Sequence, residues 1–195
     1  MKRRLGVTLV EVLVVIAIMA VLVALLFPAV QSVRDAAKRT KCSNKLRQIS
    51  LAIASFEAVH RVFPAGIHGP DHEEFPSLSF LGQVLGYVEQ NMLADQMSRE
   101  FSSGLHPILG PHATFQSYVD LFVCPSDPRL GSPQYTHQNR LVGLTSYLGV
   151  NGTDYRSENG VFYRDSLTRH SDITDGLSQT LLLGERPPSS DNWYG

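Results

Sequence analysis

A single ionisable residue, Glu11, lies inside an apolar stretch that runs from Leu5 to Val33. An ionised side chain in a membrane helix costs about 2.5–3.5 kcal/mol on insertion scales, so this carboxylate needs either a partner or a place at the interface. If the chain were cut after Gly6, the new amine of Val7 would offer that partner, most usefully to Glu11 of a neighbouring subunit. The alternative is that Glu11 lies near the end of a membrane span and reaches the interface.

The two cysteines, Cys42 and Cys124, allow one disulfide at most, so the chain is not a disulfide-dense mini-protein. Paired, they would close a loop of about 80 residues, for which the chain-entropy model gives roughly 4–5 kcal/mol. Unpaired, Cys42 would pack as a small apolar side chain on a helix and Cys124 would end a strand. The pairing requires Cα atoms within about 7 Å of each other, a distance that a sequence does not contain.

Hard oxygen ligands that could hold calcium occur late in the chain. Asp172 and Asp175, together with Asp154 or Asn151, offer such oxygens. Their spacing matches no complete calcium loop, and Asp175-Gly176 serves equally well as a turn. We therefore expect no cofactor, with calcium as the alternative.

Motifs that indicate catalysis or metal chemistry are absent from the sequence. It holds no G-x-S-x-G elbow, no phosphate-binding P-loop, no H-E-x-x-H and no dinucleotide-binding glycine pattern. His68, His72 and Glu73 lie in a polar loop, where an i, i+4 spacing does not place two imidazoles on one face. The sequence therefore predicts a protein that is not an enzyme and a solvated loop at these histidines.

The element that must position Glu11 is a long helix. Residues 9–30 alone would extend about 33 Å as a helix, enough to cross a hydrocarbon core of roughly 30 Å. A cleaved secretory signal has a shorter apolar core and a small-x-small site directly after it, which this run lacks. Beyond it, apolar residues recur at helical spacing in one stripe. They are Cys42, Leu46, Ile49, Ile53 and Phe56. We predict one helix from about Thr8 to His60, kinked at Pro28 and ended by residues 63–66.

Charge is distributed unevenly along the 195 residues, although the net formal charge is only -1. Residues 2–4 carry +3, residues 34–47 carry +5 and residues 48–195 carry -8. The cationic stretch at 34–47 fits a solvated helix face, contact with anionic lipid headgroups, or contact with the acidic heads of neighbouring subunits. It lacks interleaved aromatic residues, so we expect no nucleic-acid partner. The charges on the two sides of the span favour opposite orientations, so they leave the membrane topology open.

The rest of the chain predicts a small α+β head. A second, shorter helix is expected over residues 78–97, broken at Gly82 or Gly86. Short strands are expected over residues 118–123, 145–150, 160–163 and 180–183, with Asn151-Gly152 as the strongest hairpin signal.

The N-terminal residues resemble a known processing signal. The run from Lys2 through Gly6, Thr8 and Glu11 to Ile18 is similar to the leader and N-methylation segment of type IV prepilins and type II secretion pseudopilins. That resemblance implies cleavage after Gly6 by a prepilin peptidase and methylation of the new N-terminus at Val7. The family usually has Phe or Met where this chain has Val7. The resemblance also places the leader in the cytoplasm and the head outside it, in a single pass through the inner membrane.

Four further segments resemble the DUF1559 family of prepilin-type proteins. They are residues 122–128 (FVCPSDP), 146–153 (SYLGVNGT), 159–164 (NGVFYR) and 173–186 (ITDGLSQTLLLGER). The usual C-terminal His-x9-Asp-Gly motif is missing, since Asp165 stands ten residues before Asp175. A short or truncated family member is therefore expected.

Two functional hypotheses follow from these patterns. The first is a pseudopilin-like structural subunit that partners the prepilin peptidase, membrane lipid and related pilin-type subunits in a secretion or pilus-like filament. The second is a membrane-anchored ligand-binding module that does not polymerise. The expected layout is a leader (1–6), a transmembrane and assembly helix (7–33), an amphipathic continuation (34–62) and an extracytoplasmic head (63–195). The fold class expected is pilin-like α+β, with the long helix packed on a mainly antiparallel head.

Overall fold

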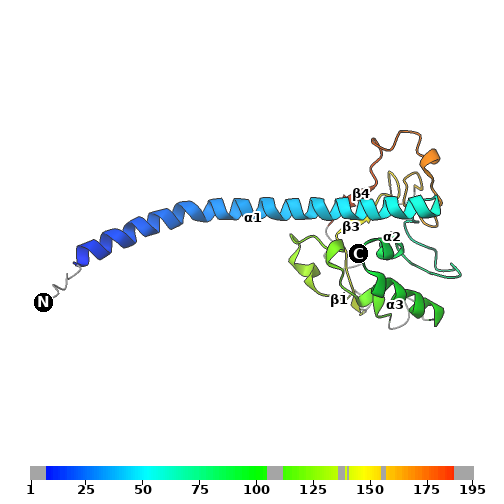
Figure 1. Ribbon diagram of the computed structural model, residues 1–195, viewed down its shortest axis with the longest axis horizontal. Helices are drawn as coiled ribbons and strands as arrows, with labels where there is room; N and C mark the ends of the chain where they lie inside the picture. The colour runs from blue at the N-terminus through cyan, green and yellow to red at the C-terminus, as the bar shows by residue number, and fades with distance from the viewer. Residues whose placement is uncertain (1–7, 105–111, 136–138, 140, 155–156, 187–195) are drawn as a thin grey trace. The chain divides into compact units, whose positions relative to one another are not determined.

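A computed structural model describes residues 8–104, 112–135, 139, 141–154 and 157–186. The chain forms two compact units, Met1–Thr40 and Lys41–Gly195. We call Lys41–Gly195 the head unit. Figure 1 shows the order of the elements along the chain.

One helix, α1, runs from Leu9 to His60 and contributes to both units. The bounds agree with the helix predicted from the apolar periodicity. Pro28 lies inside α1 and does not end it, because proline removes a single helical hydrogen bond. Arg61 follows with a φ of 63°, a left-handed conformation typical of the residue just after a helix.

The predicted apolar stripe of α1 packs into the core of the head unit. Cys42, Ile49 and Ile53 are buried, and Leu46 and Phe56 are half-buried against the same core. The other side of the core comes from short helices and loops. Its buried members outside α1 include Phe63, Phe80, Val84, Met97, Phe101, Phe122, Tyr147 and Phe162.

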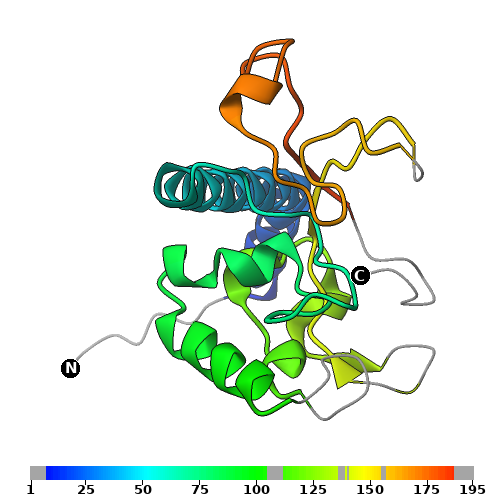
Figure 2. The ribbon, with the colours of Figure 1, turned by 90° about the vertical axis from the view of Figure 1, so that its right-hand side faces the viewer.

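The second helix predicted over residues 78–97 is wrong as a single element. The structure has α2 at Phe80–Gln83, the 3-10 helix η1 at Leu85–Tyr87, and α3 at Asn91–Ser102. Glu89 has a φ of 61°, so the chain leaves the right-handed helical region before α3 begins. Figure 2 shows α3 and the segment around η5 (His170–Asp172) on opposite sides of the C-terminal end of α1.

The strands form two small antiparallel pairs. β1 (Gln134–Tyr135) pairs with β2 (Leu141–Val142), and β3 (Tyr147–Gly149) pairs with β4 (Leu183–Glu185). In the second pair Tyr147 stands opposite Glu185, and Gly149 opposite Leu183. The long helix, the short helices and these pairs make the α+β arrangement that the sequence predicts.

Three strand predictions need correction. Residues 118–123 contain the 3-10 helix η3 (Asp120–Phe122) in place of a strand. Residues 160–163 form no strand, and the strand predicted at 180–183 begins only at Leu183. The remaining 3-10 helices are η2 (Thr114–Gln116) and η4 (Pro128–Gly131).

The Asn151-Gly152 turn also differs from the predicted hairpin. The chain leaves β3 and returns through a wider loop, in which Gly160 N–H donates to the Asn151 carbonyl at 2.9 Å. A Cβ on Gly160 would lie 2.5 Å from the Asn151 carbonyl carbon, so two backbones meet there. β3 consequently takes its strand partner from β4, more than thirty residues later in the chain.

Candidate functional site

Glu11 forms a reciprocal cap at the start of α1. The Thr8 backbone N–H and hydroxyl both donate to Glu11 Oε2 at 2.7 Å, and the Glu11 N–H donates to Thr8 Oγ1 at 3.3 Å. This is a Thr-x-x-Glu capping box, which satisfies backbone donors that the first helical turn leaves unpaired. Gly6 and Val7, the expected cleavage residues, lie outside the described residues.

The apolar side chains of α1 between Leu9 and Val33 are largely uncovered by the described residues of the chain. Its large hydrophobic residues there are 49–79% exposed. By length and composition α1 is able to cross a membrane, and none of its most apolar window is buried. Such a continuous apolar surface requires lipid or another helix as its solvent. We call residues 9–33 the apolar segment.

The start of the head unit is fixed to α1 by a disulfide. The structure joins Cys42 to Cys124 with a Cα–Cα distance of 5.3 Å, and both side chains are buried. The pairing is therefore the arrangement present in the structure, in place of two separate thiols. Cys124 follows η3, so the bond links α1 to a loop 82 residues away.

Comparisons with known proteins identify the family of the chain. A family model described as a protein of unknown function (DUF1559) matches residues 31–193. The chain belongs to the DUF1559 family. The prokaryotic N-terminal methylation motif matches residues 1–27, which include Glu11 and most of the apolar segment. Searches of curated proteins and of solved structures found no match.

The methylation motif sets what this DUF1559 protein does in broad terms. It implies prepilin processing and pilin-like assembly, and with the apolar helix it is consistent with membrane insertion. Proteins with this motif are pilin-like and generally not enzymes.

Lys45 is a head-fixing residue that the sequence interpretation missed. Its ammonium donates to the carbonyl oxygens of Asp120 and Val123, and it lies 3.0 Å from Asp120 Oδ2. The hydrogen bond from Lys45 holds the pKa of Asp120 below its usual value. The sequence contains a sign of this contact: Lys45 directly precedes Leu46 of the apolar stripe, so it lies next to the helix face that packs on the head.

The aspartates considered for calcium serve local turns. Asp172 Oδ2 accepts a hydrogen bond from the Arg169 N–H at 2.8 Å, and Asp154 Oδ1 accepts one from the Ser157 N–H at 2.9 Å. Asp175 precedes Gly176, whose φ is +85°. In the described part of the chain these carboxylates do not form a metal-sized cluster. The three ligand-type residues that lie within 4.8 Å of one another are Cys42, Cys124 and Glu185, and both sulfurs are in the disulfide.

The loop at His68 and His72 is less exposed than the solvated loop predicted, since both residues are half-buried. The two rings lie 4.0 Å apart, and His68 Nδ1 is 3.6 Å from Asp165 Oδ1, too far for a hydrogen bond. Burial, followed by the neighbouring His72, lowers the pKa of His68. Gly69 N–H donates to Asp165 Oδ1 at 2.8 Å. These residues line a cavity of about 560 Å³.

Proposed function

We propose that this chain is a structural subunit of the pseudopilin class. It is inserted as a prepilin with its leader in the cytoplasm, cut between Gly6 and Val7, and methylated at the Val7 amine by a prepilin peptidase. It then assembles through α1 into a secretion or pilus-like filament, with the head outside the cytoplasm.

The observation that supports this proposal is the exposed apolar segment with one carboxylate near its start. A lipid anchor needs the apolar surface but no charge in it, and an uncompensated carboxylate there is costly. In a bundle of such helices, Glu11 would meet the cationic amine of a neighbour in a medium of low dielectric constant, where the attraction is strong.

Mass spectrometry of the membrane-extracted protein tests the processing step. We expect a mature N-terminus at a methylated Val7. Gly6→Val should leave the chain uncut, because a branched side chain crowds the peptidase, whereas Val7→Phe should be cut normally. A wild-type protein that still begins at Met1, or begins beyond residue 30, would contradict the proposal.

Glu11→Val tests the assembly step. The variant should enter the membrane at least as well as wild type, because a charge is removed from the span, but cross-linking into oligomers should fall. Thr8→Val is the matched control, since it removes the capping hydroxyl and keeps the carboxylate; loss of an N-cap costs about 1 kcal/mol of helix stability. An equal loss of cross-linking in both variants would mean that Glu11 acts as a helix cap. Unchanged cross-linking in both variants would mean that Glu11 has no role in assembly.

A second candidate function is a membrane-anchored ligand-binding module that does not polymerise. It is favoured by the cavity beside His68, His72 and Asp165, which has the size of a small-molecule site. This candidate predicts a monomer, cleaved or uncleaved, and two copies of the chain should then not cross-link in the membrane.

A further inference from the structure

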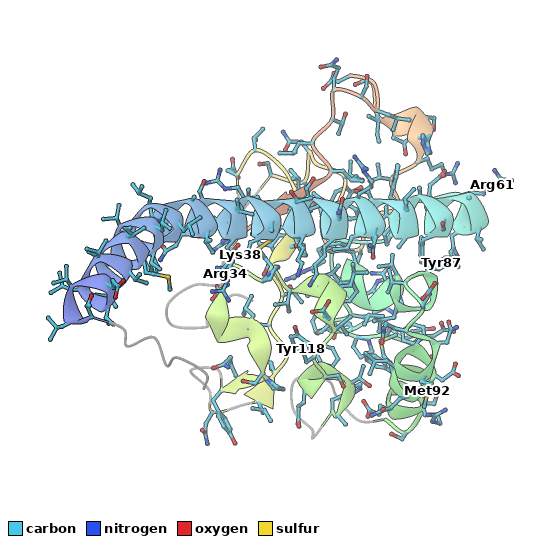
Figure 3. All side chains as sticks on the ribbon, turned by 60° about the vertical axis from the view of Figure 1, so that its left-hand side comes forward. Arg34, Lys38, Arg61, Tyr87, Met92 and Tyr118 are labelled. Carbon is cyan, nitrogen blue, oxygen red and sulfur yellow. A yellow bond between two sulfur atoms is a disulfide. The ribbon has the colours of Figure 1, made fainter. Side chains whose placement is uncertain are left out.

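Three cations follow the apolar segment directly, and we call Arg34, Lys38 and Arg39 the basic band. Arg34 and Arg39 are exposed, and the Lys38 side chain is 40% exposed. Figure 3 shows Arg34 and Lys38 on one side of α1, as their i, i+4 spacing requires. The acid beside them, Asp35, lies 3.9 Å from Lys38 with its side chain 70% exposed. An exposed pair of this kind contributes little, so the band keeps most of its charge.

The position of the band along the helix matches a lipid headgroup layer. Arg34 lies 25 helical residues after Leu9, which is about 38 Å of axial rise. A hydrocarbon core is about 30 Å thick, and each headgroup layer adds roughly 5–8 Å. If Leu9 lies at one boundary of the core, Arg34 emerges in the opposite headgroup layer. Lys38 and Arg39 follow within about two turns, and their long side chains can extend back toward it.

Two further cations of the 34–47 stretch, Lys45 and Arg47, have different surroundings. Lys45 is bound by the carbonyls and carboxylate of the loop around Asp120. Arg47 lies thirteen residues beyond Arg34 along α1, so a headgroup layer at Arg34 does not extend to it. Lys41 is exposed as well, but it belongs to the head unit. The three residues of the basic band are therefore the cations of this stretch that lie before the head unit, at the depth of the headgroup layer.

We propose that the basic band binds anionic phospholipid, with phosphatidylglycerol as the test ligand. Arg and Lys next to a membrane surface attract anionic headgroups, and guanidinium binds phosphate through paired hydrogen bonds. The inference depends on α1 being inserted in a bilayer. It does not depend on cleavage after Gly6 or on filament assembly, so it can be tested on the uncleaved Gly6→Val chain.

The full-length chain in vesicles of phosphatidylcholine and phosphatidylglycerol at a 4:1 ratio provides the test. Spin-labelled versions of both lipids report which one the protein immobilises. We expect a preference for phosphatidylglycerol that falls as salt rises. Each cation removed should reduce the preference by up to about fivefold, so the triple variant Arg34→Gln/Lys38→Gln/Arg39→Gln should keep only the part of the preference that the +3 charge of residues 2–4 contributes.

Arg47→Gln is the matched control, because it removes the same charge from the same helix beyond the headgroup layer. It should keep the wild-type preference and its salt dependence. An Arg47→Gln loss as large as that of a single band variant would mean that net charge alone acts, and would overturn the proposal. A triple variant that keeps the lipid preference but loses cross-linking to a second copy would also overturn it, by assigning the band to a neighbour's acidic head. If the triple variant inserts poorly, the single variants Arg34→Gln and Arg39→Gln decide the question against Arg47→Gln.

Discussion

The two halves of α1 have the same backbone and opposite surroundings. Ile16 in the first half is 60% exposed, whereas Ile53 in the second half is 0% exposed against the head core. The first half contains one acid and no cation between Leu9 and Val33, and the second half alternates apolar stripe residues with Lys, Arg and Ser. The first half of α1 therefore needs lipid or another helix to cover its apolar side chains. The second half is covered by the core of the head unit.

This difference separates two kinds of function within one helix. Substitutions in the second half should act on the stability of the head unit, which can be measured in detergent as unfolding. Substitutions in the first half should act on insertion and assembly and leave that unfolding unchanged.

The largest effect is expected from the disulfide. Cys42→Ser/Cys124→Ser should lower the free energy of unfolding of the head unit by about 4 kcal/mol, since the bond closes a loop with a sequence separation of 82. Chemical denaturation of the full chain in micelles, followed by near-ultraviolet circular dichroism, measures this change. Membrane insertion should match wild type. Reduction of the wild-type chain should reproduce the loss, and two free thiols in the denatured, unreduced wild type would contradict the prediction.

The next effect comes from the apolar stripe. Ile53→Ala should destabilise the head unit by about 3 kcal/mol, because it opens a cavity at a fully buried position. Ile16→Ala is the matched control: the same atoms are removed from the same helix at an exposed position. It should leave head unfolding unchanged. Similar losses for the two variants would mean that the halves of α1 are not energetically separate.

A smaller effect is expected at Lys45. Lys45→Met keeps the aliphatic stem but removes the donor that the carbonyls of Asp120 and Val123 share. Hydrogen bonds to charged groups contribute about 1.5–3 kcal/mol, so we expect a loss of about 2 kcal/mol in head stability. Lys41→Met, at an exposed position one turn earlier, should change it by less than about 0.5 kcal/mol. Equal losses in the two variants would mean that Lys45 acts only through its positive charge and not through its hydrogen bonds to the two carbonyls.

The smallest effect is the pH dependence of the head unit. Burial lowers the pKa of His68 and of His112 below the ordinary value of 6.5, so the folded chain takes up these protons less readily than the unfolded chain. Head stability should therefore fall as the pH drops below about 6.5. Urea midpoints between pH 8 and pH 5 measure this fall.

A second acid-dependent loss should follow at lower pH. The hydrogen bond from Lys45 lowers the pKa of Asp120, and hydrogen bonds from Gln96 and Thr114 outweigh burial in lowering that of Glu100. Both carboxylates stabilise the fold while ionised, and this contribution disappears as they are protonated below about pH 4.5. The helicity of the apolar segment should not follow either step. Head stability that rises on acidification would contradict both sign assignments.

The long helix and its apolar stripe could be predicted from sequence because both depend on local periodicity. Residues 42, 46, 49, 53 and 56 recur at the spacing of one helix face, and all five pack against the head core. The exposure of the apolar segment could be predicted in the same way, since a helix without a polar face is typical of a membrane span or of a fully buried core helix. Belonging to the DUF1559 family follows from segments that resemble it along most of the chain.

The strand order of the head could not be predicted in the same way. The hairpin signal at Asn151-Gly152 is local, whereas β3 pairs with β4, a contact between segments more than thirty residues apart. Residues 118–123 have strand-like composition, yet the carbonyls of Asp120 and Val123 turn toward Lys45 and the segment forms η3. The grouping of His68, His72 and Asp165 depends on contacts between residues nearly a hundred positions apart.

The Cys42–Cys124 bond also has a mechanical meaning. Tension applied between the N-terminal helix and the C-terminal end of the chain enters the head at Cys42, crosses to Cys124 through the sulfur bridge, and bypasses the residues between them. If that segment unravelled, it would add about 280 Å of extended chain, and the bridge keeps this length out of reach of the pull. The core contributed by α1, α2 and α3 belongs almost entirely to the shielded loop, so a head pulled from its ends would resist stretching where most of its packing lies.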